Sequence, residues 1–508
     1  MLKKPIKLSY FVLLLSAINL VFYNIPVYRD ALNNLDIKTF NGILLFASLT
    51  IAALVANALL FYLLLFLFRV FGKGILVVLF CGNAVALYFI NTYGVMIDTT
   101  MIGNVFNTNF EEASSFFSFT LIGYFVVLGI LPSILLFKLK TIYPTLKKFA
   151  IHVLLTLVFL LSFAYINARN WLWIDKNAKT LGSLVMPWNY LVNINRYYIH
   201  KDDDKDTQLL LPNATIKDHQ KSIVVLVIGE SARRENFSLY GYKKDTNPLL
   251  SKIPNVHSYL AESSATYTTA GVKSILEYKD TDKLYEILPN YLFRNHVGVF
   301  WRTTNFGEPK VNIKSYQNRE ALEKICKGDD CAYDEVLLSG LKEQILSCKD
   351  NKILVILHTS TSHGPSYFKK YPPRFNKFNP VCESVELENC SHEELVNAYD
   401  NTIVYTDYLL ASLIGDLKDL KDYHSCMIYL SDHGESLGED NLYMHGIPKS
   451  IAPKQQIDIP FIVWTSDDSK KLKPNKEMLF QYYVFHSVLD FLAIKSPIYD
   501  QKMSIFRP

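Results

Sequence analysis

The sequence predicts an N-terminal helical membrane domain with five transmembrane helices, followed by an α/β domain with a mostly parallel sheet. Long runs of Leu, Phe, Val and Ile dominate the chain up to about residue 168, whereas charged residues reach an ordinary globular frequency beyond Asp175. Short β-branched runs then alternate with helical stretches. A chain of 508 residues is long enough for two or three domains.

Five apolar stretches are long enough to cross a bilayer, which takes about 20 residues in a helix. We interpret the first as a retained helix, because it lacks a small-residue cleavage site and four further candidate spans follow it. The five stretches are residues 8–28, 42–68, 75–90, 116–137 and 149–168.

The lysines predict the orientation of these spans, because positively charged loops stay on the cytoplasmic side. Residues 1–7, 69–74 and 138–148 are basic, while residues 93–118 contain no Lys or Arg. We therefore expect a multi-pass protein with a cytoplasmic N-terminus. Everything after about residue 168 would lie outside the cytoplasm, in the periplasm if the membrane is the inner membrane of a diderm bacterium.

Cysteine spacing agrees with an oxidising compartment. Cys326 with Cys331, and Cys382 with Cys390, bracket short polar loops as local disulfides do. Cys348 and Cys426 each precede a strand-like run and could pair across neighbouring strands, a question that the sequence leaves open. The net charge of +4 is too small to indicate a nucleic-acid partner.

The soluble part divides into a connector, residues 169–216, and a globular domain, residues 217–508. The connector mixes tryptophans with charges, as a segment lying along a membrane surface does. Uninterrupted β-branched runs in the globular domain predict strands buried on both faces, and the helical stretch 390–419 separates two of them. The predicted strands are residues 222–230, 353–359, 426–434 and 459–466.

Two of these runs end in side chains suited to a metal ion. Glu230 follows one run, and Asp432 with His433 follow another. In parallel sheets ligands bind beyond the carboxyl ends of the strands. Two carboxylates and an imidazole suit zinc or manganese with a fourth position open. The alternative is structural: Asp432 caps a helix, and Glu230 forms a surface ion pair.

A hydroxyl-rich segment, residues 263–276, lies between those runs and offers a nucleophile. A metal with an open position can activate a hydroxyl for attack. Thr266, Thr268 and Thr269 are equal candidates from the residues alone. A Thr that caps a helix beginning near Ala270 is the structural alternative.

Four long blocks carry a resemblance to a known family. In chain order they are "VIGESARRENFSLYGYKKDTNP", "TSHGPSYFKKY", "VCESVELENC" and "SDHGESLGEDNLYMHGIPKSIAPKQQ". They resemble the signature blocks of the bacterial lipid A phosphoethanolamine transferases, membrane members of the alkaline phosphatase and sulfatase superfamily. The likeness spans the whole chain, including five spans before the catalytic domain.

The resemblance implies a zinc ion held by Glu, Thr, Asp and His, with the Thr as nucleophile. Glu230, Asp432 and His433 match directly. The nucleophile block departs from the family's Cys-Gly-Thr-x-Thr-Ala run, because this chain has "ATYTTA" and lacks both cysteines that commonly brace this loop. A gap-free register places the nucleophile on Thr269, and a shift by one places it on Thr268. One zinc ion is expected, with the presence of a second left open.

Three further residues match single positions of the family. His363 and His445 match histidines that contact the phosphate or a second metal ion, and Lys310 matches a substrate-contacting lysine. Histidines in loops are more often merely solvated, but here both lie in matching blocks beside glycines.

The lysine-free outer loop contains a regular polar pattern. Asn104, Thr108 and Glu112 recur every four residues and would share one face of a helix. A polar helix face lying on the membrane is the plain interpretation. The resemblance implies that these residues line the donor lipid's head-group site, with Glu112 meeting its ammonium.

The resemblance implies a two-step transfer of phosphoethanolamine from phosphatidylethanolamine, through a phosphothreonine intermediate. The acceptor is lipid A, the lipopolysaccharide core, or another envelope glycan or protein, and we expect a monomer. The closest alternative is a glycerophosphotransferase of the lipoteichoic acid synthase type, with phosphatidylglycerol as donor. A non-catalytic membrane anchor or receptor is the alternative from another class.

Overall fold

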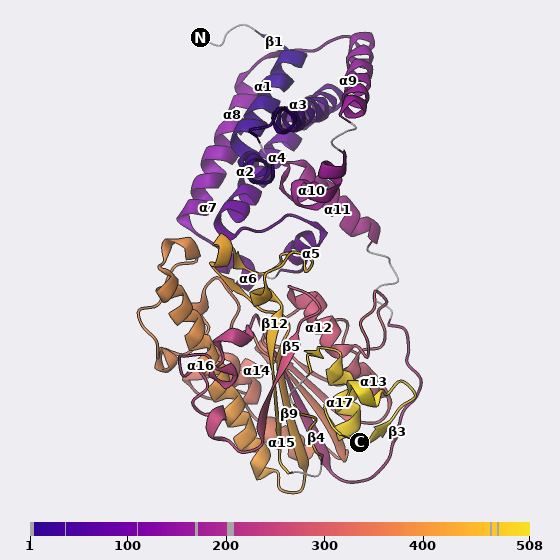
Figure 1. Ribbon diagram of the computed structural model, residues 1–508, viewed down its shortest axis with the longest axis vertical. Helices are drawn as coiled ribbons and strands as arrows, with labels where there is room; N and C mark the ends of the chain where they lie inside the picture. The colour runs from indigo at the N-terminus through magenta and orange to yellow at the C-terminus, as the bar shows by residue number, and fades with distance from the viewer. Residues whose placement is uncertain are drawn as a thin grey trace. The chain divides into compact units, whose positions relative to one another are not determined.

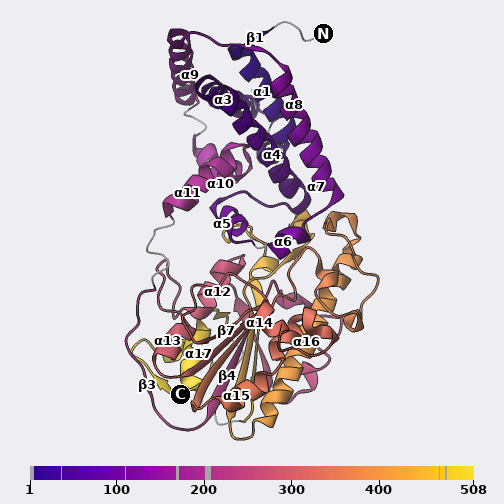
Figure 2. The same ribbon diagram turned by 180° about the vertical axis from the view of Figure 1, so that it is seen from behind.

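The computed structural model describes residues 5–35, 37–108, 110–167, 171–200, 208–467, 470–474 and 477–507. The chain divides into two compact units, which we describe separately (Figures 1 and 2). The helical unit comprises Met1–Thr108 with Phe117–His200, and the sheet unit comprises Asn109–Phe116 with Lys201–Pro508.

The helical unit consists of long apolar helices and two short strands that pair in parallel. Its elements are β1 (Ile6–Lys7), α1 (Leu8–Tyr23), α2 (Ile25–Asn34), α3 (Phe40–Phe68), α4 (Val70–Tyr93), α5 (Thr99–Asn107), α7 (Phe119–Tyr124), the π-helical segment η1 (Phe125–Ile130), α8 (Leu131–Lys138), β2 (Thr141–Ile142), α9 (Leu146–Ile166), α10 (Trp171–Leu184) and α11 (Trp188–His200).

Within the described residues, four helices are long and apolar enough to cross a bilayer: α3, α4, α9 and the run from α7 through η1 to α8. Helices α1 and α2 make a fifth candidate when they count as one span, bent by 63°. Pro26 lies in the first turn of α2 and cannot continue the hydrogen-bond ladder of α1, which explains the break. Counted this way, the helices match the five predicted spans.

Buried amide side chains join the helices of this unit. Asn19 Oδ1 accepts hydrogen bonds from Asn24 Nδ2 at 2.8 Å and from Asn57 Nδ2 at 2.9 Å. Trp188 Nε1 of α11 donates to Asn57 Oδ1 at 2.7 Å. Such bonds join helices well in a membrane, where hydrophobic burial no longer drives association. The Trp188 bond also shows why α11 groups with the membrane helices, and in α10 the Trp173 Nε1 donates to the Asn34 carbonyl of α2 at 3.4 Å. Both helices are part of the predicted connector 169–216.

The sheet unit is built around an eight-stranded sheet with the order β13-β5-β12-β9-β4-β8-β6-β7. Its strands are β3 (Thr215–Ile216), β4 (Ser222–Gly229), β5 (Val256–Glu262), β6 (Gly298–Thr303), β7 (Ser315–Gln317), β8 (Lys352–His358), β9 (His424–Ser431), β10 (Ser436–Leu437), β11 (Tyr443–Met444), β12 (Asp458–Thr465), β13 (Leu479–Phe480) and β14 (Ile494–Lys495). Its helices are α6 (Phe110–Ser115), α12 (Thr268–Leu276), α13 (Leu288–Arg294), α14 (Arg319–Glu323), α15 (Leu341–Ser347), α16 (His392–Asp419) and α17 (Tyr483–Phe491).

Strand direction brings the polar loops together. β4 pairs in parallel with β8 and β9, and β6 pairs in parallel with β8. β12 runs antiparallel to both of its neighbours, so the sheet is mostly parallel, as the sequence predicts. Gly229 lies opposite Ser431 at the ends of β4 and β9. The residues that follow these two strands therefore emerge side by side at one edge.

Helices cover both faces of this sheet. Figures 1 and 2 show α16 on one face and α12, α13 and α17 on the other. On the second face, Val224, Leu226 and Ile228 of β4 belong to one fully buried cluster with side chains of these three helices. The strand residues between them are equally buried, so β4 is enclosed on both faces. This burial explains the uninterrupted apolar run in the sequence.

The two predicted local disulfides are present, Cys326–Cys331 and Cys382–Cys390. Cys348 and Cys426 are free thiols, so the pairing that the sequence left open does not occur in this structure. Cys426 is buried within β9 of the sheet, and Cys348 follows α15.

The long helix α16 begins with a capping box that we expect to stabilise the sheet unit. The Ser391 hydroxyl accepts from the backbone N–H of Glu394, whose carboxylate accepts in return from the Ser391 N–H. Ser391→Ala should lower the free energy of unfolding by about 1 kcal/mol. Thermal melting of the purified chain measures this, with Ser251→Ala at an exposed site as the control. Equal melting of the two variants would contradict it.

Candidate metal centre and active site

The turn after β4 holds Glu230 in a fully enclosed position. Ser231, the next residue, has φ of 53°, a left-handed conformation that is costly for a non-glycine residue. Three hydrogen bonds hold it there: its N–H donates to Asp432 Oδ1 at 3.0 Å, its hydroxyl donates to Glu230 Oε1 at 2.7 Å, and its carbonyl accepts from the Tyr399 hydroxyl of α16 at 2.7 Å. The strained turn is therefore coupled to the side chain that it presents.

The turn after β9 sets the orientation of His433. Its Nδ1 lies 2.9 Å from the carbonyl oxygen of Gly434, so Nδ1 carries the proton and donates. Burial, followed by the nearby His445, lowers the pKa of the His433 imidazole to about 3. The ring is therefore neutral at physiological pH, and Nε2 presents a lone pair.

That lone pair faces oxygen atoms. His433 Nε2 lies 3.4 Å from Glu230 Oε1, 3.3 Å from Asp432 Oδ2 and 3.4 Å from the Thr268 hydroxyl. Asp432 Oδ2 is buried without a hydrogen-bond partner among the described residues. A neutral imidazole nitrogen surrounded by carboxylate oxygens is unfavourable unless a cation lies between them. The donor set of two carboxylates, one imidazole and one hydroxyl fits a divalent metal ion.

The two carboxylates also need a positive charge close to them. Burial raises the pKa of Asp432 well above its ordinary value, and the Glu230 carboxylate raises it further. Burial also opposes the ionisation of Glu230, yet the neighbouring histidines, His433 first, hold its pKa below the ordinary value. Two enclosed carboxylates this close need positive charge to ionise together. A bound divalent cation supplies it.

The position at which α12 starts distinguishes the candidate nucleophiles. Thr268 is the first residue of this helix, is buried, and its hydroxyl lies 3.3 Å from Glu230 Oε2. Gly271, one turn later, packs so tightly that an added Cβ would lie 2.3 Å from the carbonyl oxygen of Asp432. Residues three apart share a helix face, so Thr268 faces the metal ligands together with Gly271. Thr269, the residue favoured by the gap-free register, is half-buried, and its methyl group lies beside Gly307.

Two further histidines lie next to this cluster. The ring centroid of His445 lies 4.2 Å from that of His433 and 5.9 Å from that of His363. Metal-ligating atoms of Glu230, His433 and His445 all lie within 4.8 Å of one another. His445 Nδ1 lies 3.0 Å from the buried carboxylate of Glu435, which orients its ring. The structure thus brings the predicted His363 and His445 to the predicted ligands.

Asn305 belongs to the site, although the sequence did not indicate it. The predicted residue in this segment was Lys310. Asn305 Nδ2 donates to Glu230 Oε2 at 2.7 Å and to the Thr359 carbonyl at 2.9 Å, so it fixes the carboxylate of a metal ligand. It follows β6, a strand whose carboxyl end lies at the same edge of the sheet, and that position is the signal that could have found it. The Lys310 side chain is exposed, and its carbonyl accepts from Gln208 and Asn290.

The prediction of one helical face for Asn104, Thr108 and Glu112 is wrong. Helix α5 ends at Asn107, Thr108 has extended backbone angles, and Glu112 belongs to a second helix, α6. The Thr108 hydroxyl donates back to the Asn104 carbonyl at 2.8 Å. Asn and Thr side chains compete with the helical backbone in this way, which favours a helix end. The side chain of Glu112 lies outside the described part of the structure.

The chain is similar to known families and proteins. The sulfatase family model matches residues 222–494, and the model described as phosphoethanolamine transferase EptA/EptB matches residues 54–201. The phosphoethanolamine transferase EptA of Helicobacter pylori is 40% identical over 97% of this chain and 95% of its own length. The chain belongs to the phosphoethanolamine transferase family.

Two solved structures are also similar to this chain. The integral membrane lipooligosaccharide phosphoethanolamine transferase A of Neisseria meningitidis has the same fold, with a TM-score of 0.90 at 23% identity over 99% of this chain and 100% of its own. The C-terminal periplasmic domain of the phosphoethanolamine transferase EptC of Campylobacter jejuni is 34% identical, with a TM-score of 0.53 over 59% of this chain and 98% of its own. As a phosphoethanolamine transferase, the chain is an enzyme of a metal-dependent class.

The contact between α12 and the Asp432 turn yields a test of the site. Gly271→Ala should displace the start of α12 and destabilise the chain by about 1–3 kcal/mol, because the new methyl group overlaps the Asp432 carbonyl. Bound metal per chain, measured by plasma mass spectrometry, should fall together with the melting temperature.

Gly415→Ala in α16 is the matched control, since an added Cβ there meets open space. It should raise stability by about 0.5–1 kcal/mol and leave the metal content unchanged. Full metal content in Gly271→Ala would show that the tight approach of α12 is not needed by the site.

Proposed function

We propose that this chain transfers phosphoethanolamine from phosphatidylethanolamine to an envelope acceptor, such as lipid A or the lipopolysaccharide core, through a phosphothreonine adduct on Thr268. The observation that carries the proposal is the position of the Thr268 hydroxyl, 3.3 Å from Glu230 and 3.4 Å from His433. The proposed nucleophile is therefore one residue before Thr269, the residue that a gap-free alignment with the family predicts.

The metal that we propose is zinc, held by Glu230, Thr268, Asp432 and His433. Four donors of this type suit its tetrahedral preference. When bound, the ion stabilises negative charge on the nucleophile and on the phosphoryl group. His363 and His445 are the residues that would contact the phosphate or hold a second ion. For the donor's head group we retain Asn104, Thr108, Glu112 and Lys310 as proposals.

The reaction then has two steps. Thr268 Oγ1 attacks the phosphorus of the donor, the bond from phosphorus to the diacylglycerol oxygen breaks, and diacylglycerol leaves with a proton. An acceptor oxygen next attacks the same phosphorus, and Thr268 regains its hydroxyl. His445 is suited to proton transfer, because the contact of its Nδ1 with the buried carboxylate of Glu435 orients the ring beside the metal ligands. Asn305 keeps Glu230 oriented throughout.

The proposal also includes the compartment in which the sheet unit lies. The basic loops at residues 1–7, 69–74 and 138–148 support a cytoplasmic N-terminus, with the sheet unit in the periplasm. Two disulfides in the sheet unit support an oxidising environment there. A lipid donor and a lipid-linked acceptor explain why the catalytic unit is attached to membrane helices.

Removal of the Thr268 hydroxyl tests the nucleophile. Thr268→Ala should lower transfer by at least about 10³-fold and abolish the adduct, with unchanged melting, because the attacking oxygen is lost. Mass spectrometry of the purified chain after incubation with phosphatidylethanolamine measures the adduct on the peptide containing residues 266–271. Thr269→Ala is the matched control and should still form it.

An adduct that persists in Thr268→Ala and disappears in Thr269→Ala would restore the other register. The adduct's mass also tests the donor, since phosphatidylglycerol would leave glycerol phosphate without an amine. Absence of any adduct on the unmodified chain would favour a non-catalytic anchor.

Metal removal should abolish adduct formation and lower the melting temperature. A ligand present at a thousandfold excess over its Kd stabilises the folded state by about 4 kcal/mol. Dialysis against a chelator, followed by calorimetry and by the adduct assay with and without added zinc, measures both effects. Adduct formation at full rate in the metal-free chain would contradict the assigned ligands.

A further inference from the structure

Gln481 is a fully buried side chain that joins two parts of the metal centre. It follows β13, which pairs in parallel with β5, so the residues after both strands emerge side by side. Its side-chain oxygen accepts from the Ser264 N–H at 2.9 Å. Its Nε2 donates to the carbonyls of Asp432 at 2.6 Å and of Ser431 at 3.1 Å. Gln481 thus connects the turn that presents Asp432 to the loop that leads into α12.

The loop before α12 is in turn bonded to that helix. The Ser264 and Ser274 hydroxyls lie 2.7 Å apart and share a hydrogen bond. Ser274 belongs to α12, the helix that begins at Thr268. Residues 263–276 contain no cysteine, so no disulfide ties this loop. A connected set of hydrogen bonds therefore leads from Asp432 to the helix that carries Thr268.

Other bonds tie the same loop to the segment that carries His445. The Thr266 hydroxyl donates to the Ile447 carbonyl at 2.6 Å, and the Thr266 carbonyl accepts from the Gly446 N–H at 2.9 Å. These bonds fix the loop relative to His445. They leave its position relative to Asp432 to other contacts.

Packing and hydrogen bonding together fix α12 relative to the Asp432 turn. An added Cβ on Gly271 would lie 2.3 Å from the Asp432 carbonyl oxygen, so the helix packs closely there. The same oxygen accepts the shorter of the two Gln481 bonds. Packing limits how closely the two segments approach, whereas a hydrogen bond also restricts their direction, because it weakens steeply with angle.

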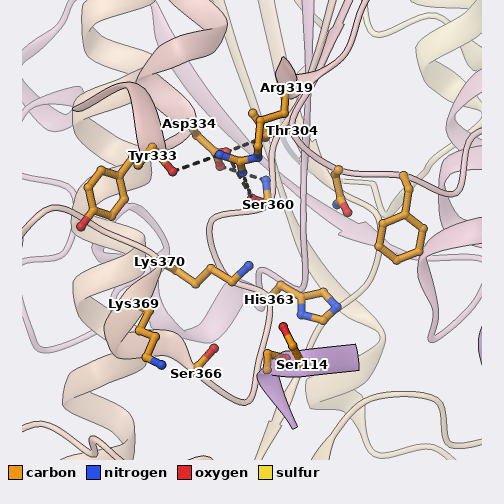
Figure 3. Close-up of a pocket in the computed structure, with 14 residues that line it drawn as sticks. Ser114, Thr304, Arg319, Tyr333, Asp334, Ser360, His363, Ser366, Lys369 and Lys370 are labelled. Atoms are coloured by element: carbon orange, nitrogen blue, oxygen red, sulfur yellow. Dashed lines mark hydrogen bonds between the residues drawn. The ribbon is translucent and has the colours of Figure 1, made fainter. Parts of the chain in front are cut away.

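Gln481 lies where a substrate does not reach it. A cavity of about 280 Å³ adjoins the metal centre, and its lining includes His363 and Asn305 (Figure 3). Gln481 is not among the described residues that line this cavity, and its side chain is enclosed by protein. Its effect on a reaction therefore passes through the residues that it holds.

We propose that Gln481 is a positioning residue, which holds the Thr268 hydroxyl against Glu230 and His433 and so sets the rate of the first transfer step. The inference rests on the proposed function, in which Thr268 is the nucleophile. That hydroxyl lies 3.3 Å from Glu230 and 3.4 Å from His433. A misplacement of about 1 Å can lower a rate by about 10²-fold. Loss of the Gln481 bonds should allow such a shift of the start of α12.

The test follows the adduct over a single turnover of the full-length enzyme, by mass spectrometry after mixing with phosphatidylethanolamine. Gln481→Met keeps the length of the side chain and removes its three hydrogen bonds. The rate constant of adduct formation should fall by at least about tenfold, while the final amount of adduct and the donor concentration at half-maximal rate stay unchanged. A purely structural role would instead lower the final amount, because fewer chains are folded, and leave the rate constant unchanged.

Gln501→Met is the matched control. Gln501 likewise accepts from a hydroxyl, that of Tyr499, and donates to a carbonyl, that of Phe506 at 3.1 Å, and neither partner belongs to the metal centre. Its rate constant should equal that of the unmodified enzyme.

Ser274→Ala is the second variant, which decides the matter where Gln481→Met does not fold. It breaks the bond between Ser264 and α12 and should lower the rate constant about fivefold, as expected for one neutral hydrogen bond. An unchanged rate constant in Gln481→Met, or in Ser274→Ala where the first variant does not fold, would overturn the inference, as would a fall confined to the final amount of adduct. Absence of any adduct on the unmodified enzyme would instead contradict the proposed function.

Discussion

The site depends on the repulsion between two enclosed carboxylates. Glu230 and Asp432 both lie within 3.4 Å of the lone pair on His433 Nε2, in a place from which water is excluded. Charged groups are costly to bury unless opposite charge compensates them. The nearest histidine, His433, is neutral and does not compensate that charge. A divalent cation would compensate the two carboxylates, and in the proposed reaction it would also stabilise negative charge on the attacking threonine.

Rigid supports hold these groups together against that repulsion. The parallel pairing of β4 with β9 fixes the two strand ends, while hydrogen bonds from Tyr399 and Asp432 hold the strained turn at Ser231. Asn305 fixes the second oxygen of Glu230. The start of α12 approaches the Asp432 turn at a glycine, which leaves no room for a Cβ. Each support comes from a different part of the chain, so the site forms only when the whole sheet unit folds.

The sequence by itself determined the strands, the long spans, both disulfides and the grouping of Glu230, Asp432 and His433, because burial and strand direction leave a periodic, local record in the chain. Only the tertiary structure shows that the Thr268 hydroxyl, and not that of Thr269, contacts Glu230 and His433, since this depends on where α12 starts relative to Asp432, more than 160 positions away. Asn305 was found in the same way. The four-residue polar pattern did not predict the break between α5 and α6. Whether a Thr or Asn side chain continues a helix or ends it depends on its surroundings, which the pattern does not contain.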